Sequence, residues 1–213
     1  MTMDYKREVY TVGHSNHQIE YFLELLQSQK INTLIDVRSM PASSYNPQFN
    51  KDPLENFLKQ YGITYMHFGE EFGARHDDED ILDEEGVVNF ETFRKSFVFQ
   101  QGVERVDIGL SKGFKIALMC SEGNPLECHR FSMISVYLEE IGIHVKHILK
   151  DKTIKSHTEL ENELLKKYKK KIPQPSLFEP DVNEADQLKH AYKLHNKEVG
   201  WQSERYKHTN EQP

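Results

Sequence analysis

The sequence has few cysteines, no long apolar run and no excess of basic residues. Its 213 residues include only two cysteines, too few for a disulfide framework and typical of a protein in a reducing compartment. No apolar stretch is long enough to span a bilayer, and residues 1–12 lack the apolar segment of a signal peptide. We therefore expect a cytoplasmic protein without a membrane partner.

The charge balance excludes one class of function. The formal net charge is −7, so the chain is not a basic coat protein for nucleic acid, although local basic patches can still bind phosphate. Hydrophobic residues make up 37% of the chain. This fraction is low but still that of a globular protein, and we attribute the low value to polar terminal segments. A chain of this length can bury one sizeable core.

Apolar segments at regular intervals predict a sheet of about five strands. These strands are expected at residues 9–12, 32–38, 63–68, 114–119 and 144–149. Helical spacing of apolar residues recurs between them, and alternating strands and helices imply parallel strands with right-handed crossovers. The fold class predicted is a single Rossmann-like three-layer α/β domain with a mostly parallel central sheet, followed by a C-terminal helix and tail.

The composition changes near the C-terminus. Leucines at helical spacing in residues 160–168 predict a charged amphipathic helix, and polar residues and prolines dominate from residue 172 onward. We divide the chain into an α/β domain, residues 1–171, and a polar, partly disordered tail, residues 172–213. One helix is expected within the tail, around residues 184–195.

The first of three reactive clusters follows the strand at residues 9–12. Gly13 allows a tight turn, after which Ser15 and the helix amides could bind an anion. Alternatively, Ser15 or Asn16 simply caps the following helix. His14 is a candidate catalytic acid or base, or else a surface histidine.

The second cluster is Asp36 and Arg38, at the end of the strand at residues 32–38. Charged groups that end a buried strand need partners. Asp36 is a candidate acid or base and Arg38 a candidate phosphate ligand. The structural alternative pairs Asp36 with a loop amide and Arg38 with a surface carboxylate. The loop that follows adds Asn46 as a candidate substrate contact.

The third cluster follows the strand at residues 114–119. Residues 124–127 predict a helix start that would place Cys128 and Arg130 near the amino end of the helix. A thiolate is favoured there by the helix dipole and by neighbouring cations, which makes Cys128 a candidate nucleophile. Arg130 has the planar fork of donors that suits phosphate or carboxylate.

Glu122 and His129 are candidate acids or bases in this third cluster. Cys120 fits a small buried residue that ends the strand. Cys120, Cys128 and His129 lack a recognised ligand spacing and a fourth ligand, so we expect no metal site. The sequence does not identify a cofactor.

These clusters, in this order, resemble the prokaryotic family called domain of unknown function 488. The matching motifs are Thr11–Ser15, Ile35–Arg38 with Pro41, Asn46–Asn50, Gly69–Arg75, and Cys120-x-Glu122 through Cys128-His129-Arg130. The resemblance extends over roughly residues 10–149, implies the α/β fold and adds Arg75 as a candidate substrate contact. Ser44 is a departure, because family members often carry an arginine there.

A second resemblance concerns the tail. Residues Gln174–Phe178 are similar to the short peptide by which bacterial DNA-processing enzymes dock on the sliding clamp. Such a peptide presents a Leu-Phe pair from an exposed segment. Gln174, Leu177 and Phe178 are therefore candidate contacts to a clamp, unless the Leu-Phe pair folds onto the domain.

Three functions follow. The leading hypothesis is a hydrolase or transferase acting on a phosphate-containing substrate, a nucleotide or DNA, with Arg38 and Arg130 binding phosphate and Asp36, Glu122 or His129 moving protons. The second is a cysteine-dependent enzyme, because the strand ends are similar to the rhodanese sulfurtransferase layout. The third is a non-catalytic adaptor bound to a DNA-processing complex.

Overall fold

The predicted sheet forms the centre of the molecule. The structure is a computed structural model that describes residues 7–175 and 182–207. Within these residues, six strands form one sheet in the order β3-β2-β4-β1-β5-β6, and only β6 runs antiparallel to its neighbour. The strands are β1 (Glu8–Gly13), β2 (Thr33–Asp36), β3 (Thr64–His67), β4 (Ile116–Cys120), β5 (His144–Ile148) and β6 (Ile154–Ser156).

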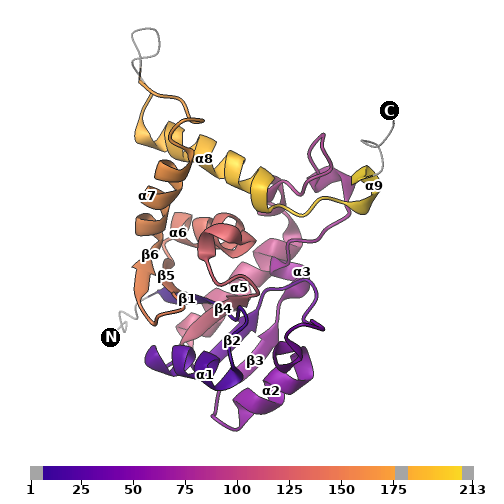
Figure 1. Cartoon of the computed structure of the whole chain (residues 1–213), viewed down its shortest axis with the longest axis vertical. Helices are drawn as coiled ribbons and strands as arrows, with labels where there is room; N and C mark the ends of the chain where they lie inside the picture. Colours follow the sequence, from indigo (N-terminus) through magenta and orange to yellow (C-terminus); the bar gives the residue numbers. More distant parts are fainter. Residues whose placement is uncertain (1–6, 176–181, 208–213) are drawn as a thin grey trace.

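Helices cover both faces of this sheet. Helices α1 and α2 lie on one side, and α5 and α6 lie on the other (Figure 1). The helices are α1 (Ile19–Ser28), α2 (Lys51–Lys59), α3 (Gly69–Phe72), α4 (Phe90–Phe93), α5 (Phe97–Ser111), α6 (Val136–Glu140), α7 (His157–Tyr168), α8 (Glu184–Val199) and α9 (Glu204–Lys207). Short 3-10 turns occur at Pro47–Phe49, Glu79–Ile81 and Pro125–Glu127, and a π-helical turn occurs at Arg130–Ser135.

Strand β4 shows how the sequence builds two cores. Side chains alternate between the faces of a strand, so Ala117 and Met119 pack in the core formed with α1 and α2. Leu118 and Cys120 pack in the core formed with α5 and α6. All four are buried, as a central parallel strand requires. The Cys120 side chain therefore lies on the face covered by α6.

The predicted fold class is confirmed, and all five predicted strands are present. The sequence does not predict β6, because a three-residue strand is too short to show alternation. The predicted cap of the first helix is wrong: Gln18 is the N-cap of α1, without a side-chain hydrogen bond, rather than Ser15 or Asn16.

The segment after β4 also differs from the prediction. Residues Pro125–Glu127 form a separate 3-10 turn, capped by Asn124, whose side chain accepts a hydrogen bond from the Leu126 amide at 3.1 Å. Cys128 is extended, with φ −140° and ψ 142°. The π-helical turn begins only at Arg130. Cys128 thus precedes the helical segment, and π turns are frequent at functional sites.

Connections leave neighbouring strands toward opposite faces at the carboxyl end of the sheet. β1 and β2 lead to α1 and α2 on one face, whereas β4 leads to the π-helical turn and α6 on the other. Open α/β sheets bind ligands at such topological switch points. The end of β4, between β1 and β2, is therefore the expected site.

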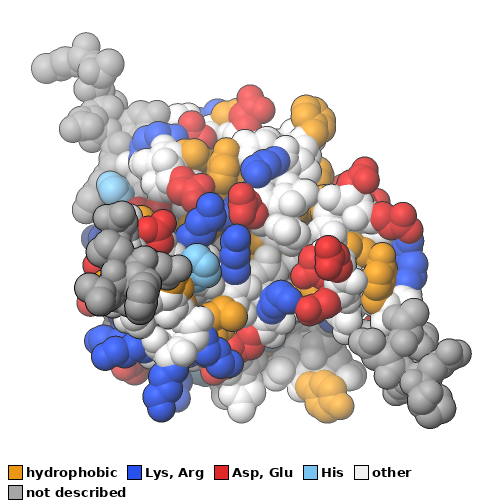
Figure 2. Space-filling model, turned by 90° about the horizontal axis from the view of Figure 1, so that it is seen from above, with side chains coloured by type: hydrophobic (Ala, Val, Ile, Leu, Met, Phe, Trp, Pro, Cys, Tyr) orange, Lys and Arg blue, Asp and Glu red, His pale blue; other side chains and the backbone are white. Residues whose placement is uncertain are grey.

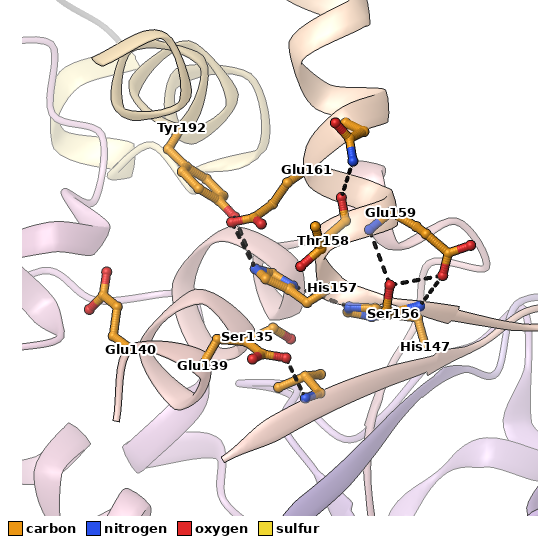
Figure 3. A network of polar contacts seen from close by, with 12 residues as sticks. Ser135, Glu139, Glu140, His147, Ser156, His157, Thr158, Glu159, Glu161 and Tyr192 are labelled. Carbon is orange, nitrogen blue, oxygen red and sulfur yellow. Dashed lines mark hydrogen bonds and ion pairs between the residues drawn. The ribbon is translucent and has the colours of Figure 1, made fainter. Parts of the chain in front are cut away.

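Helix α8 is the helix predicted around residues 184–195, and it packs against α7 and the π-helical turn. A buried polar chain connects it to the sheet (Figure 3). Nε2 of His157 lies 2.9 Å from the hydroxyl of Tyr192, and Nδ1 of His157 lies 3.3 Å from Nε2 of His147.

The domain boundary at residue 171 stays a prediction. No helix in the described residues is long and apolar enough to cross a membrane.

Candidate functional site

Three parallel strands end level at the predicted site. Gly13 pairs with Cys120, and Asp36 pairs with Met119. A Cβ atom at Gly13 would lie 1.9 Å from the carbonyl oxygen of Glu122, so only glycine lets the segment after β4 approach β1 this closely. The side chains that follow the three strands therefore lie near one another.

Asp36 and Arg38 form a buried ion pair at the end of β2. Nε and Nη2 of Arg38 donate to the two carboxylate oxygens of Asp36 at 2.9 and 2.5 Å, and the Tyr65 hydroxyl donates to Oδ2 of Asp36 at 2.7 Å. Burial alone would lower the pKa of Arg38, but the hydrogen bond and charge of Asp36 raise it. Asp36 also accepts a hydrogen bond from the backbone amide of Arg38 at 3.1 Å, so the expected loop amide is one of its partners. Arg38 pairs with Asp36 rather than with a surface carboxylate.

The other contacts of Arg38 connect it to His14. Nη1 of Arg38 lies 3.1 Å from Nε2 of His14, and Nη2 donates to the carbonyl of Phe49 at 2.7 Å. Nδ1 of His14 donates to the carbonyl of Ser15 at 2.7 Å. Burial lowers the pKa of His14 to about 4, so the ring is neutral near neutral pH. Because these nitrogens already have partners, their contacts do not favour the predicted roles of Arg38 in phosphate binding and His14 in acid–base chemistry, which stay predictions.

Ser15 and Asn46 lie in the loops around this pair. Ser15 has a left-handed backbone, with φ 48°, and its hydroxyl donates to the side chain of Asn16 at 3.3 Å. Asn46 precedes the 3-10 turn Pro47–Phe49. Within the described residues, no hydrogen bond joins the Asn46 side chain to the cluster. Substrate binding by Ser15 and Asn46 stays a prediction.

Both cysteines lie in the second half of the site. Nδ1 of His129 is 3.8 Å from Sγ of Cys120 and 3.7 Å from Sγ of Cys128. These three residues are buried, and their donor atoms lie within 4.8 Å of one another. Sγ of Cys120 also donates to Oε2 of Glu122 at 2.9 Å, although Glu122 itself is exposed. Two sulfur atoms and one nitrogen atom, all of kinds that bind metal ions, thus lie close together.

The surroundings move the pKa values of these groups apart. Burial raises the pKa of Cys120 well above its usual value. Burial alone would also raise the pKa of Cys128, but the hydrogen bond from Cys120 and the charges of Arg130 and His129 lower it well below its usual value. Burial opposes protonation of His129, but Cys128 raises its pKa. Burial of its carboxyl group and the neighbouring Cys128 raise the pKa of Glu122.

Arg130 is fully buried and holds the loop after β4. Its Nη1 donates to the carbonyl of Glu122 at 2.7 Å, and its Nη2 donates to the carbonyl of Gly123 at 3.3 Å. Within the described residues its Nε has no hydrogen-bond partner. The carbonyl of Arg130 accepts from the Ser135 hydroxyl at 2.7 Å, which satisfies it inside the π-helical turn. Phosphate binding by Arg130 stays a prediction.

A hollow of about 580 Å³ lies beside the ends of β2 and β3. Arg75 lines it, and the Arg75 amide donates to Oγ of Ser39 at 3.0 Å. Arg75 is a residue that the sequence predicts for the site, whereas His67 and His76, which also line the hollow, are not predicted from the sequence. His67 ends β3, so its position at a strand end is the signal that could have identified it.

Fold and site define a Rossmann-like α/β domain with reactive side chains at the carboxyl ends of β1, β2 and β4. The family model for the domain of unknown function DUF488 matches residues 18–138, more than half of the 213 residues. The chain belongs to this family, as the motif resemblance predicts. No curated protein and no solved structure matches the chain.

The predicted clamp peptide is only partly described. The side-chain amide of Gln174 donates to the carbonyls of Lys169 and Ile172 at 3.1 and 3.2 Å. Leu177 and Phe178 lie outside the described residues. Binding of a sliding clamp therefore stays a prediction.

Proposed function

We propose that this protein is an enzyme, a hydrolase or transferase, that binds a phosphate-containing substrate in the hollow beside β2 and β3. Arg75 carries the proposal: its guanidinium is exposed, and among the described residues it has no hydrogen bond or ion pair. An arginine of this kind can donate two parallel hydrogen bonds to a phosphate. The hollow, at about 580 Å³, is within the usual range for small-molecule sites.

Two histidines of the hollow support proton transfer there. Nε2 of His67 donates to the carbonyl of Arg38, and Nε2 of His76 donates to the carbonyl of Gly73, each at 2.8 Å. The neutral ring then keeps a lone pair on Nδ1, and neither Nδ1 has a hydrogen-bond partner in the described part of the chain. Burial lowers the pKa of His76, which supports a neutral base near neutral pH.

The charge distribution favours a nucleotide over a long nucleic acid. On the face shown in Figure 2, acidic and basic side chains are interspersed rather than gathered into one basic patch. Glu70 and Glu71 also line the hollow, and Glu71 is paired with Arg105. Long nucleic acids are bound through many phosphate contacts, whereas one unpaired arginine suits one phosphate group. Both cysteines are free, which fits the cytoplasm, the compartment that we propose.

Calorimetric titration of the full chain with nucleoside monophosphates, nucleoside triphosphates and a single-stranded oligonucleotide tests this proposal. We expect Arg75→Ala to weaken nucleotide binding at least about tenfold, because a hydrogen bond to a charged group contributes roughly 1.5–3 kcal/mol. Lys59→Ala is the matched control, since Lys59 is an exposed cation in the last turn of α2, which leads to the amino end of β3. Equal affinity of the parent and Arg75→Ala would refute the proposal.

The other two functions have less support. Reactive cysteines are usually partly exposed, whereas Cys120 and Cys128 are 3% and 1% exposed. Alkylation of the native protein as fast as of a free thiol would restore the sulfurtransferase hypothesis. The adaptor hypothesis depends on Leu177 and Phe178, outside the described residues, and clamp binding lost on deleting residues 172–213 would support it.

A further inference from the structure

We propose that Cys120, Cys128 and His129 form a binding site for a metal ion of the zinc class. Nδ1 of His129 lies 3.8 and 3.7 Å from the two sulfurs. Around tetrahedral zinc, with Zn–S of about 2.3 Å and Zn–N of about 2.0–2.1 Å, a sulfur and a nitrogen ligand are about 3.5–3.6 Å apart. Both sulfur–nitrogen distances are therefore slightly longer than those around zinc, and all three donor atoms lie within 4.8 Å of one another.

The backbone explains how residues without a recognised ligand spacing meet. Cys120 ends β4, and its side chain lies on the α6 face of the sheet. The 3-10 turn Pro125–Glu127 returns the chain toward that strand end, and the extended Cys128 then lies between the turn and the π-helical segment. Both sulfurs and the His129 ring are thus held by secondary structure on either side.

Hydrogen bonds orient His129 as a ligand. Its Nε2 lies 3.3 Å from the carbonyl oxygen of Val37 and 3.1 Å from that of Phe72. Carbonyl oxygens only accept hydrogen bonds, so Nε2 carries the proton, and the neutral ring has its lone pair on Nδ1, beside the sulfurs. Metal-ligating histidines typically donate their second ring nitrogen in this way.

Glu122 lies beside the three donor residues. Its Oε2 is 2.9 Å from Sγ of Cys120, and the residue is exposed. A zinc ion with three protein ligands keeps one position for water or a further ligand. The carboxylate of Glu122 therefore gives the fourth position either a ligand or a group that binds the metal-bound water. Because Glu122 as a whole residue is exposed, it marks the side of the site that solvent reaches.

The charges balance when the metal is present. Two thiolates, one carboxylate and a neutral imidazole around a divalent ion leave one net negative charge. Arg130 supplies a buried positive charge, its amide donates to Sγ of Cys128 at 3.4 Å, and no ion pair joins its guanidinium to a carboxylate among the described residues. Buried charges require such compensation. Two thiolates with an imidazole also select zinc over magnesium or calcium.

Metal content of the full chain, purified under reducing conditions, is the first measurement. We expect about one zinc ion per chain, and after cobalt substitution a thiolate-to-cobalt charge-transfer band with the visible bands of tetrahedral cobalt. Cys120→Ser, Cys128→Ser and His129→Ala should each weaken metal binding by more than about 100-fold, the upper range for second-shell changes. Glu122→Gln should keep the charge-transfer band, because both sulfurs remain.

His190→Gln is the control, since His190 is an exposed histidine on α8 outside both proposed sites, and this variant should bind metal like the parent. A reduced parent protein that gives no cobalt–thiolate band overturns the proposal, even if the ligand variants do not fold. So does a band that survives unchanged in Cys128→Ser. A disulfide between the two cysteines would also overturn the proposal. Thiol counting would detect it in protein purified without reductant, and the same bond would have to be present in cells.

Discussion

The histidine chain between β5, α7 and α8 predicts that acid destabilises the fold. His157 is buried between His147 and Tyr192 (Figure 3), and burial lowers its pKa from 6.5 to about 3. Between these two values the unfolded chain binds a proton that the folded chain does not bind. The stability due to the neutral ring is therefore complete above about pH 6.5 and is lost as the pH falls toward about pH 3.

The size of the effect follows from proton linkage. One pKa unit corresponds to about 1.4 kcal/mol, so between about pH 7 and about pH 5 His157 alone should lower the free energy of unfolding by about 2 kcal/mol. His147 acts in the same direction, because burial and the neighbouring His157 lower its pKa well below the usual value. Marginal domain stabilities of about 5–15 kcal/mol make this loss easy to detect.

Urea unfolding of the parent and of His157→Gln at several pH values measures the effect. Glutamine keeps a polar side chain beside Tyr192 but does not titrate. Below about pH 6 the free energy of unfolding of the variant should therefore depend less steeply on pH than that of the parent, by about 1.4 kcal/mol per pH unit, the contribution of one proton. His190→Gln, an exposed histidine on α8, should retain the parent slope. Equal slopes for parent and His157→Gln, or an NMR titration of His157 near pH 6.5 in the folded chain, would refute the reasoning.

Two further changes test the packing of the site by urea unfolding. Asp36→Asn leaves the buried guanidinium of Arg38 without its carboxylate, and we expect a loss of about 3–5 kcal/mol. The exposed Asp52→Asn in α2 is the control, and equal losses in both variants would contradict a buried ion pair. Gly13→Ala should also destabilise strongly, because its Cβ would lie 1.9 Å from the carbonyl oxygen of Glu122. An unchanged urea midpoint would show that the loop moves without cost.

The sheet could be predicted because its central strands are apolar runs that are followed by glycine or polar residues. Residues 9–12 are followed by Gly13, and the apolar run of β4 ends at Cys120. Features set by backbone geometry could not be predicted. The sequence Asn124–Glu127 fits a helix start, but the chain completes only a 3-10 turn there before Cys128 becomes extended. The π-helical turn that follows likewise has no distinct sequence pattern.

For the site, the sequence predicts which groups meet but not which of them remain unpaired. Arg38, Arg75 and Arg130 are equivalent as candidate anion ligands in the sequence. In the fold, the Arg38 side chain pairs with Asp36 at the end of β2. Arg130 donates to two backbone carbonyls of the loop after β4. Only Arg75 lies exposed in a hollow. Side-chain partners depend on backbone turns that residue types do not determine.

His129 connects the two proposed sites. Its Nδ1 faces the sulfurs of Cys120 and Cys128, and its Nε2 faces the carbonyl of Phe72, three residues before Arg75. A metal ion would fix the ring, and the ring would hold the backbone from which Arg75 extends. The hollow and the metal site can nevertheless be tested apart, because Arg75→Ala leaves every proposed metal ligand in place. Nucleotide binding without metal would leave the first proposal standing, and a cobalt–thiolate band without nucleotide binding would leave the second.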